Sequence, residues 1–324
     1  MGRLLAHLAL AALTALLTVS TAGCASNDDA SNASNASTGN GALPRVGVAV
    51  YPLADIVHRL QLPIDTVVVV PAGQEAHDYD PTAKDIDRLS GVDVFFYLGQ
   101  GFQPNVETAL SALSTNTRTI DLLSNLALLP ITDPLAGTEG EIGGEALVGD
   151  MDPHVWLAPA NMAVMAAAIV DSLVQAALVT AADGAAALAR ADADYRALDA
   201  EFSTGLHTCE RHELVTTHRA FGYLADAYGL TQVSIAGISP SEEPSAKTLE
   251  AVATFVKAHH VTTIFSEENL PADLATTVAE ETGATTASLD TAESPSADRL
   301  HDGDDYLTMM RGNLGSIQRA LGCV

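Results

Sequence analysis

Three histidines and one aspartate have the chemistry of a metal site, although they are spread over most of the chain. They are His77, His154, His218 and Asp290. Three imidazole nitrogens and one carboxylate oxygen form a donor set that suits zinc or another borderline divalent ion. Their separation is far larger than in a compact zinc motif. Spacing alone therefore leaves a metal site and four separate structural residues as alternatives.

His154 is held in a short, stiff segment. It lies between Pro153 and Val155 in residues 152–157 (DPHVWL), two positions before the only tryptophan, Trp156. Proline fixes one backbone angle, and the bulky indole restricts how the imidazole points. This arrangement is typical of a metal ligand, but a loop histidine beside a core tryptophan has the same pattern. A metal site therefore requires partners from elsewhere in the chain.

Hydrophobic patterning predicts an α/β fold. From residue 43 onward, short runs of β-branched residues alternate with helical patterns, and such βαβ repetition predicts parallel sheets flanked by helices. Strands are expected at residues 45–50, 65–70, 92–98, 117–122, 213–217, 232–235, 262–265 and 285–289. Helices are expected at residues 53–60, 82–89, 105–113, 159–179, 183–206, 220–228, 245–258, 271–282 and 305–321.

The N-terminus has the pattern of an export signal. An apolar run over residues 4–19 follows Arg3 and ends in small residues before Cys24. This resembles a bacterial lipoprotein signal, after which Cys24 carries a lipid that anchors the protein outside the cytoplasm. A transmembrane anchor is the alternative, although the run is short for the roughly 20 residues that a span needs. The Ser- and Asn-rich residues that follow predict a flexible tether.

The predicted organisation has two similar lobes. The helix at residues 183–206 is polar over much of its surface, as expected of a long rigid helix that joins two lobes. The segments are a signal peptide (1–23), a tether (24–42), an N-terminal lobe (43–182), the linking helix (183–206) and a C-terminal lobe (207–324).

Charge and cysteine content restrict the partners. The formal charge of −26 argues against nucleic acid, which requires clustered Lys and Arg, and is compatible with cations. We interpret most of that charge as serving solubility. We interpret the acidic loop at residues 130–151 as a solvated loop, with weak attraction of cations as the alternative. In an exported protein, Cys209 and Cys323 suggest one disulfide, with two free thiols as the alternative.

Strand ends connect the four candidate ligands. His77 lies in the loop after the strand at 65–70, while His218 and Asp290 directly follow the strands at 213–217 and 285–289. Ligands of open parallel sheets bind at the carboxyl ends of strands. These three residues and His154 are therefore expected to face one cleft between the lobes.

Four segments resemble a known family. They are residues 73–81 (GQEAHDYDP), 152–157 (DPHVWL), 217–224 (THRAFGYL) and the tail with 289–290 (LD) and 306–314 (YLTMMRGNL). Together they resemble the zinc/manganese solute-binding lipoproteins of bacterial ABC importers (cluster A-I, zinc-type). The resemblance implies two α/β lobes joined by a rigid helix, capture of a divalent ion outside the cytoplasmic membrane, and its delivery to a permease. It also implies that His77, His154, His218 and Asp290 are the metal ligands.

The expected metal is zinc, with manganese as the alternative. A histidine at position 218 gives nitrogen-rich coordination, which favours zinc, whereas a carboxylate there would favour manganese. Arg219, where relatives often have an acidic residue, is expected to lower the pKa of His218. Glu75 and Glu267 are candidates for an accessory ligand or for orienting an imidazole, although a solvated or structural role is the alternative.

Two other classes of function are weighed. In a secreted mononuclear zinc hydrolase, three protein ligands leave an open position for water, whereas four ligands make a closed site. The chain has no His-Glu-x-x-His or Gly-x-Ser-x-Gly motif, so we expect that the protein is not an enzyme. A surface adhesin without transport is the other alternative. The protein is expected to be a monomer.

Overall fold

Two four-stranded sheets, each with all its strands parallel, form the framework of the molecule. The computed structural model describes residues 42–113, 116–131, 135, 151–267 and 271–324. The first sheet has the order β2-β1-β3-β4, and the second has the corresponding order β6-β5-β7-β8. The strands are β1 Arg45–Val48, β2 Asp65–Val68, β3 Val94–Tyr97, β4 Arg118–Asp121, β5 Glu213–Thr216, β6 Thr231–Ser234, β7 Thr263–Glu267 and β8 Thr285–Leu289.

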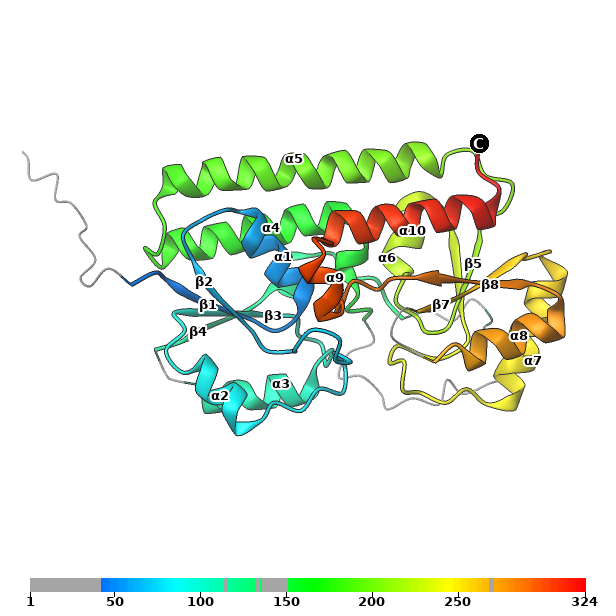
Figure 1. Cartoon of the computed structure of the whole chain (residues 1–324), viewed down its shortest axis with the longest axis horizontal. Helices are drawn as coiled ribbons and strands as arrows, with labels where there is room; N and C mark the ends of the chain where they lie inside the picture. Colours follow the sequence, from blue (N-terminus) through cyan, green and yellow to red (C-terminus); the bar gives the residue numbers. More distant parts are fainter. Residues whose placement is uncertain (1–41, 114–115, 132–134, 136–150, 268–270) are drawn as a thin grey trace, which may run out of the picture. The chain divides into compact units, whose positions relative to one another are not determined.

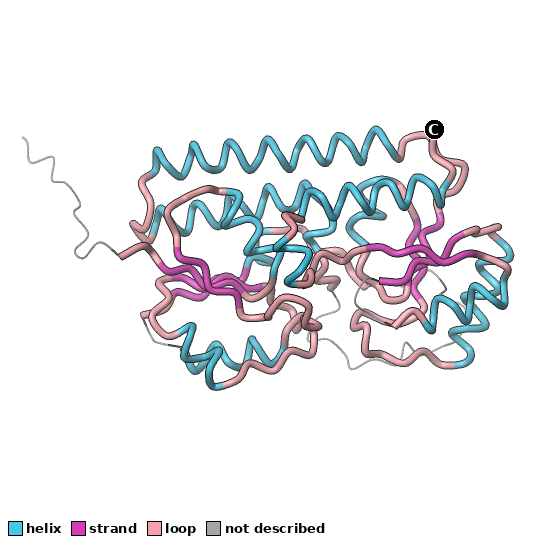
Figure 2. The backbone as a smooth tube through the Cα atoms, in the orientation of Figure 1, coloured by secondary structure: helices cyan, strands magenta, loops and turns pink. Residues whose placement is uncertain are grey.

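Helices cover both faces of each sheet (Figures 1 and 2). The long helix α5 runs above both sheets, with α1, α4 and α10 beneath it, while α2 and α3 lie below the first sheet and α7 and α8 flank the second. The helices are α1 Tyr51–Arg59, α2 Ala83–Leu89, α3 Pro104–Ala109, α4 Pro159–Gln175, α5 Ala181–Gly205, α6 Gly222–Tyr228, α7 Ala246–Ala258, α8 Asp273–Thr282, α9 Ala297–His301 and α10 Tyr306–Leu321.

The predicted α/β fold with two lobes and a long joining helix is confirmed, and the differences are local. The expected start of the joining helix at residue 183 is wrong. Thr180 is the N-cap, since its hydroxyl accepts a hydrogen bond from the Asp183 backbone N–H at 3.1 Å. The short helix α9 was not predicted. The lobe boundaries at residues 182/183 and 206/207 remain a proposal.

One continuous hydrophobic core joins the helical layer to both sheets. Helix α5 buries Tyr195, Leu198 and Phe202, and the same cluster of buried side chains includes Val48 of the first sheet and Leu214 of the second. Two smaller clusters fill the opposite faces of the sheets. Because the upper faces of both sheets share a core, the helical layer fixes the two lobes to each other.

A cluster of charged side chains reinforces this joint. The Arg59 guanidinium in α1 contacts Asp55 in its own helix at 3.1 Å, Asp194 of α5 at 3.2 Å and Asp305 at the start of α10 at 3.0 Å. Asp55 is buried and also accepts a hydrogen bond from the Tyr195 hydroxyl. A planar guanidinium with several donors is suited to such bridging, so one side chain connects three helices.

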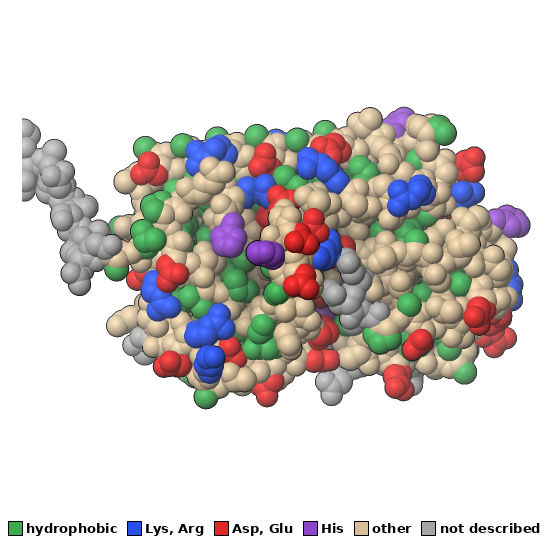
Figure 3. Space-filling model, in the orientation of Figure 1, with side chains coloured by type: hydrophobic (Ala, Val, Ile, Leu, Met, Phe, Trp, Pro, Cys, Tyr) green, Lys and Arg blue, Asp and Glu red, His purple; other side chains and the backbone are tan. Residues whose placement is uncertain are grey.

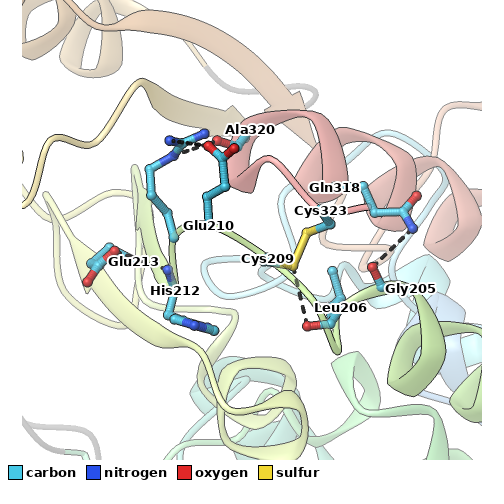
Figure 4. Close-up of a disulfide and its surroundings, with 10 residues drawn as sticks. Gly205, Leu206, Cys209, Glu210, His212, Glu213, Gln318, Ala320 and Cys323 are labelled. Carbon is cyan, nitrogen blue, oxygen red and sulfur yellow. Dashed lines mark hydrogen bonds and ion pairs between the residues drawn. A yellow bond between two sulfur atoms is a disulfide. The ribbon is translucent and has the colours of Figure 1, made fainter.

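A disulfide closes the end of the second lobe. Cys209 follows α5 and is bonded to Cys323, which follows α10, as the sequence predicted (Figure 4). Nearby, the Gln318 side chain donates a hydrogen bond to the Gly205 carbonyl at 3.1 Å. The C-terminus is therefore fixed to the segment that enters the second sheet.

Replacing both cysteines with serine is expected to lower the free energy of unfolding by about 2–5 kcal/mol, because the bond closes a long loop in the unfolded chain. The loop spans a sequence separation of 114 residues. Urea unfolding of the Cys209→Ser/Cys323→Ser protein measures the loss. The control is wild type in dithiothreitol, which should unfold at the same urea concentration as the variant. Equal midpoints for oxidised wild type and the variant would contradict the prediction.

Candidate metal centre

The fold brings the three predicted histidines to one point between the lobes. His77 lies in the loop after β2, His154 directly precedes a short 3-10 helix (Val155–Leu157), and His218 lies two residues after β5. All three side chains are buried. The Nε2 atoms of His77 and His154 are 3.3 Å apart, and the His218 ring is within 6 Å of both other rings, at 5.9 and 5.4 Å between centroids.

Glu293 completes this group. One nitrogen from each histidine and one carboxylate oxygen of Glu293 lie within 4.8 Å of one another. Its oxygens are 3.9 Å from His77 Nε2 and 3.7 Å from His154 Nε2. Three imidazoles and one buried carboxylate therefore converge, which is the donor set of a closed tetrahedral site.

Asp290, the fourth ligand predicted from the sequence, is not in that group. Its carboxylate pairs with Arg299 and accepts a hydrogen bond from the Ala292 backbone at 2.7 Å. The strand-end argument selected the first polar residue after β8, whereas Ala292, in the left-handed region with φ of 53°, turns the chain before Glu293. A second acidic residue in the same loop was the available signal. Asp290 as a ligand remains a prediction, and the distances favour Glu293.

Asp152 orients His154. The Asp152 carboxylate lies 2.8 Å from His154 Nδ1 and also accepts a hydrogen bond from the His154 backbone N–H at 2.9 Å. Burial raises the pKa of Asp152 to about 7, against the opposing effect of this hydrogen bond. With Nδ1–H donated to Asp152, the Nε2 lone pair of His154 is available to a metal ion.

Glu267, at the end of β7, orients His218. Its carboxylate contacts His218 Nδ1 and accepts hydrogen bonds from the His218 backbone N–H at 2.9 Å and from the Thr217 hydroxyl. The proposed orienting role of Glu267 is thus confirmed. The expectation that Arg219 lowers the pKa of His218 is wrong: burial lowers it, but the charge of Glu267 and the hydrogen bond to it outweigh burial and raise it.

Burial disfavours the charged forms of the other three side chains. The pKa values of His77 and His154 are far below the usual range, because burial and the neighbouring imidazoles disfavour their protonated forms. Burial raises the pKa of Glu293 to about 8, although His218 opposes this. Neutral imidazoles are the form that binds metal, and a cation replaces the proton on the carboxylate.

Two donor atoms at this point have no hydrogen-bond partner among the described residues. They are His218 Nε2 and Glu293 Oε1, both buried. Unpaired buried polar atoms are costly, and a cation between them would compensate both. Two ligand atoms of a tetrahedral zinc ion are about 3.3 Å apart, which is the separation found between His77 and His154. The residues present therefore fit a zinc ion.

Cavities of two sizes reach His218. One of about 50 Å³ is also lined by Gln74, Glu75, Glu267 and Asp290, and another of about 360 Å³ is lined by residues that include Thr217, Pro240 and Leu274. The smaller volume suits an ion with one or two waters. The Glu75 carboxylate accepts hydrogen bonds from the backbone of His77 at 2.8 Å and of Asp78 at 2.7 Å, so it shapes the His77 loop.

Six other histidines lie among the described residues, and all are exposed: His58, His207, His212, His259, His260 and His301. The acidic loop at residues 130–151 falls largely outside the described residues, as do residues 1–41 with the predicted signal peptide and Cys24.

A comparison with protein families gives one match. The model described as "Zinc-uptake complex component A periplasmic" (ZnuA) matches residues 46–320. These residues include all four members of the buried group and Asp290.

Known proteins and structures give the same relationship. The zinc-binding lipoprotein AdcA of Streptococcus pneumoniae is 32% identical over 257 residues, which are 78% of this chain and 50% of that protein. The high-affinity zinc uptake system protein ZnuA of Bacillus subtilis is 32% identical over 266 residues, 79% of this chain and 81% of that protein. The crystal structure of the Zn(II)-bound ZnuA-like domain of S. pneumoniae AdcA matches with a TM-score of 0.71 and 29% identity, over 86% of this chain and 99% of that one. The chain spans about half the length of AdcA.

Glu267→Gln is expected to weaken zinc binding by about 10- to 100-fold, because it removes the charge that orients and polarises His218. A competition titration against a fluorescent zinc chelator measures the affinity. Glu250→Gln, on the exposed surface of α7, is the matched control and should bind like wild type. A Glu267→Gln protein with wild-type affinity would show that His218 needs no orienting carboxylate.

Proposed function

Because the chain belongs to the ZnuA family of zinc-uptake components, we propose that it captures zinc outside the cytoplasm and passes it to an ABC permease. Zinc is its cargo, not a resident cofactor. The observation that carries the proposal is the convergence of three buried imidazoles and the Glu293 carboxylate, with three of their atoms lacking a hydrogen-bond partner among the described residues. A cation bound between these atoms would offset the free-energy cost of burying them.

In this proposal, His77, His154, His218 and Glu293 hold the ion. His77 and His154 bind as neutral imidazoles, while Glu267 fixes the ring of His218. Glu293 gives up its proton on binding and supplies negative charge in a buried place. Zinc is favoured over manganese because three nitrogens and one oxygen suit the softer ion.

We further propose that the protein is a binding protein and not an enzyme. The four donors form a closed set that leaves no open position for a reacting water. This favours capture over the alternative of a zinc hydrolase.

Location and partners follow from the same proposal. Relatives include a zinc-binding lipoprotein, and the lipid on Cys24 predicted for this chain would keep it at the outer face of the membrane. Within the described ranges, no helix combines the length and apolarity needed to cross a membrane. The permease, the lipid anchor and a monomeric state belong to the proposal.

Surface charge favours the approach of cations. The chain has a formal charge of −26, and Asp298 in α9 and Asp302 just after it are exposed. Several acidic side chains lie near the centre of the face shown in Figure 3. A negative potential raises the local concentration of cations and their rate of association. Added salt should therefore lower the association rate constant for zinc more than it changes the dissociation rate constant.

The metal-free protein is expected to bind one equivalent of zinc, more tightly than manganese. His154→Ala should lose most of the affinity, because it removes a central donor from the site. Isothermal titration calorimetry with each metal measures stoichiometry and affinity. His58→Ala, which removes an exposed histidine, is the control. Unchanged zinc binding by His154→Ala would rule out the assigned site.

A matched pair of variants identifies the fourth ligand. Glu293→Gln should weaken zinc binding by more than the roughly 100-fold that loss of an orienting group costs, because it removes a donor and its charge. Asp290→Asn should have a smaller effect, because Asp290 pairs with Arg299. The same competition titration compares them. A larger loss in Asp290→Asn would restore the ligand predicted from the sequence.

A further inference from the structure

The indole of Trp156 connects the two lobes beside the site. The ring is fully buried and packs against Phe102 and His154, with centroids 5.2 and 5.3 Å away. Its Nε1–H donates a hydrogen bond of 2.7 Å to the carbonyl of Thr291. Thr291 lies just after β8 of the second sheet, two residues before Glu293. A side chain adjacent to one candidate ligand thus holds the loop that carries another.

The loop at residues 290–294 is fixed on both sides. Towards the second lobe, Asn313 of α10 exchanges hydrogen bonds with the Asp290 backbone at 2.8 and 2.7 Å. Towards the first lobe, the Tyr51 backbone N–H donates to the Glu293 carbonyl at 3.3 Å. The Ser294 hydroxyl donates to the Pro71 carbonyl at 3.0 Å. Trp156 adds the shortest of the three bonds from the loop to the first lobe.

We propose that Trp156 is a positioning residue for zinc capture: its indole N–H holds the loop at residues 290–294 against the first lobe. This bond sets the distance from the Glu293 carboxylate to His77 and His154. The proposal rests on the proposed function and assigns Trp156 a role beyond that of a core side chain.

The hydrogen bond from Trp156 to Thr291 affects the position of Glu293 because Thr291 and Glu293 are close in sequence. Thr291 and Glu293 are separated only by Ala292, which is fully buried and in the left-handed region. A buried residue in a strained conformation leaves little room for adjustment, so a shift of the Thr291 carbonyl moves Glu293 as well. Trp156 itself is held, because its backbone carbonyl accepts a hydrogen bond from the Tyr306 hydroxyl of α10.

The experiment uses Trp156→Phe, which keeps an aromatic ring in the core and removes the N–H. We expect zinc affinity to fall about five- to tenfold, the usual effect of losing one net hydrogen bond. In the Glu293→Gln background, the same substitution should change zinc affinity less than twofold. A double-mutant cycle from four competition titrations gives this coupling.

A purely structural role for Trp156 makes the opposite prediction. If phenylalanine only loosened the core around His154, the loss would be equal with and without Glu293. Thermal unfolding of each metal-free protein shows whether the core is intact. Tyr228→Phe is the matched control, because it keeps the ring, removes a partly buried hydrogen bond to Asp199 that involves neither Trp156 nor the loop, and should leave zinc affinity unchanged.

A second variant carries the test if Trp156→Phe does not fold. Ser294→Ala removes another bond from the same loop to the first lobe, at a position that is only partly buried. It should weaken zinc binding about two- to fivefold and only when Glu293 is present. Equal losses of zinc affinity in the wild-type and Glu293→Gln backgrounds, or no loss in either, would overturn the proposal for the loop. If the wild-type protein still binds zinc in that case, the proposed function remains intact. Absence of zinc binding by wild type would overturn both.

Discussion

The hydrophobic core shared by the two lobes is the constraint on which the site depends. Its donors come from both sides: His77 and His154 precede α5, whereas His218 and Glu293 follow it. A separation of 3.3 Å between two imidazole nitrogens is useful to a metal ion only if the other donors are held equally closely. The packing of Tyr195, Leu198 and Phe202 beneath α5, with the ion cluster around Arg59, keeps the two lobes in that relation.

Burial governs the charge of the buried group. Removing imidazoles and a carboxylate from water disfavours their charged forms, so the group remains uncharged where it has no partner. Glu267 is the exception, because His218 contacts it directly and keeps its pKa below the usual range despite burial. The charged form of the Glu267 carboxylate is thus favoured beside His218, whereas burial favours the protonated form of Glu293. The pKa values of Glu267 and Glu293 differ in direction because Glu267 contacts His218 Nδ1, whereas Glu293 Oε1 has no hydrogen-bond partner among the described residues.

Much of this arrangement could be predicted from the sequence, because it follows from rules that act locally. Strand patterns and the carboxyl-end rule correctly brought His77 and His218 to one place, and the stiff segment around His154 supplied the third imidazole. Glu293 could not be found this way. Its position depends on a left-handed residue and on hydrogen bonds from distant elements, and neither leaves a pattern in neighbouring residues.

The sheet topology explains how the second lobe places His218 beside its orienting carboxylate. In the order β6-β5-β7-β8, β6 lies on one side of β5 whereas β7 and β8 lie on the other, so the strand order reverses between β5 and β7. Ligands of open parallel sheets bind at such a point. His218 follows β5 and Glu267 ends β7, so ligand and orienting carboxylate come from adjacent paired strands. Glu293 follows the edge strand β8 and has no such neighbour. Its loop is held by Asn313 of α10 and by hydrogen bonds to the first lobe, so the position of Glu293 depends on both lobes.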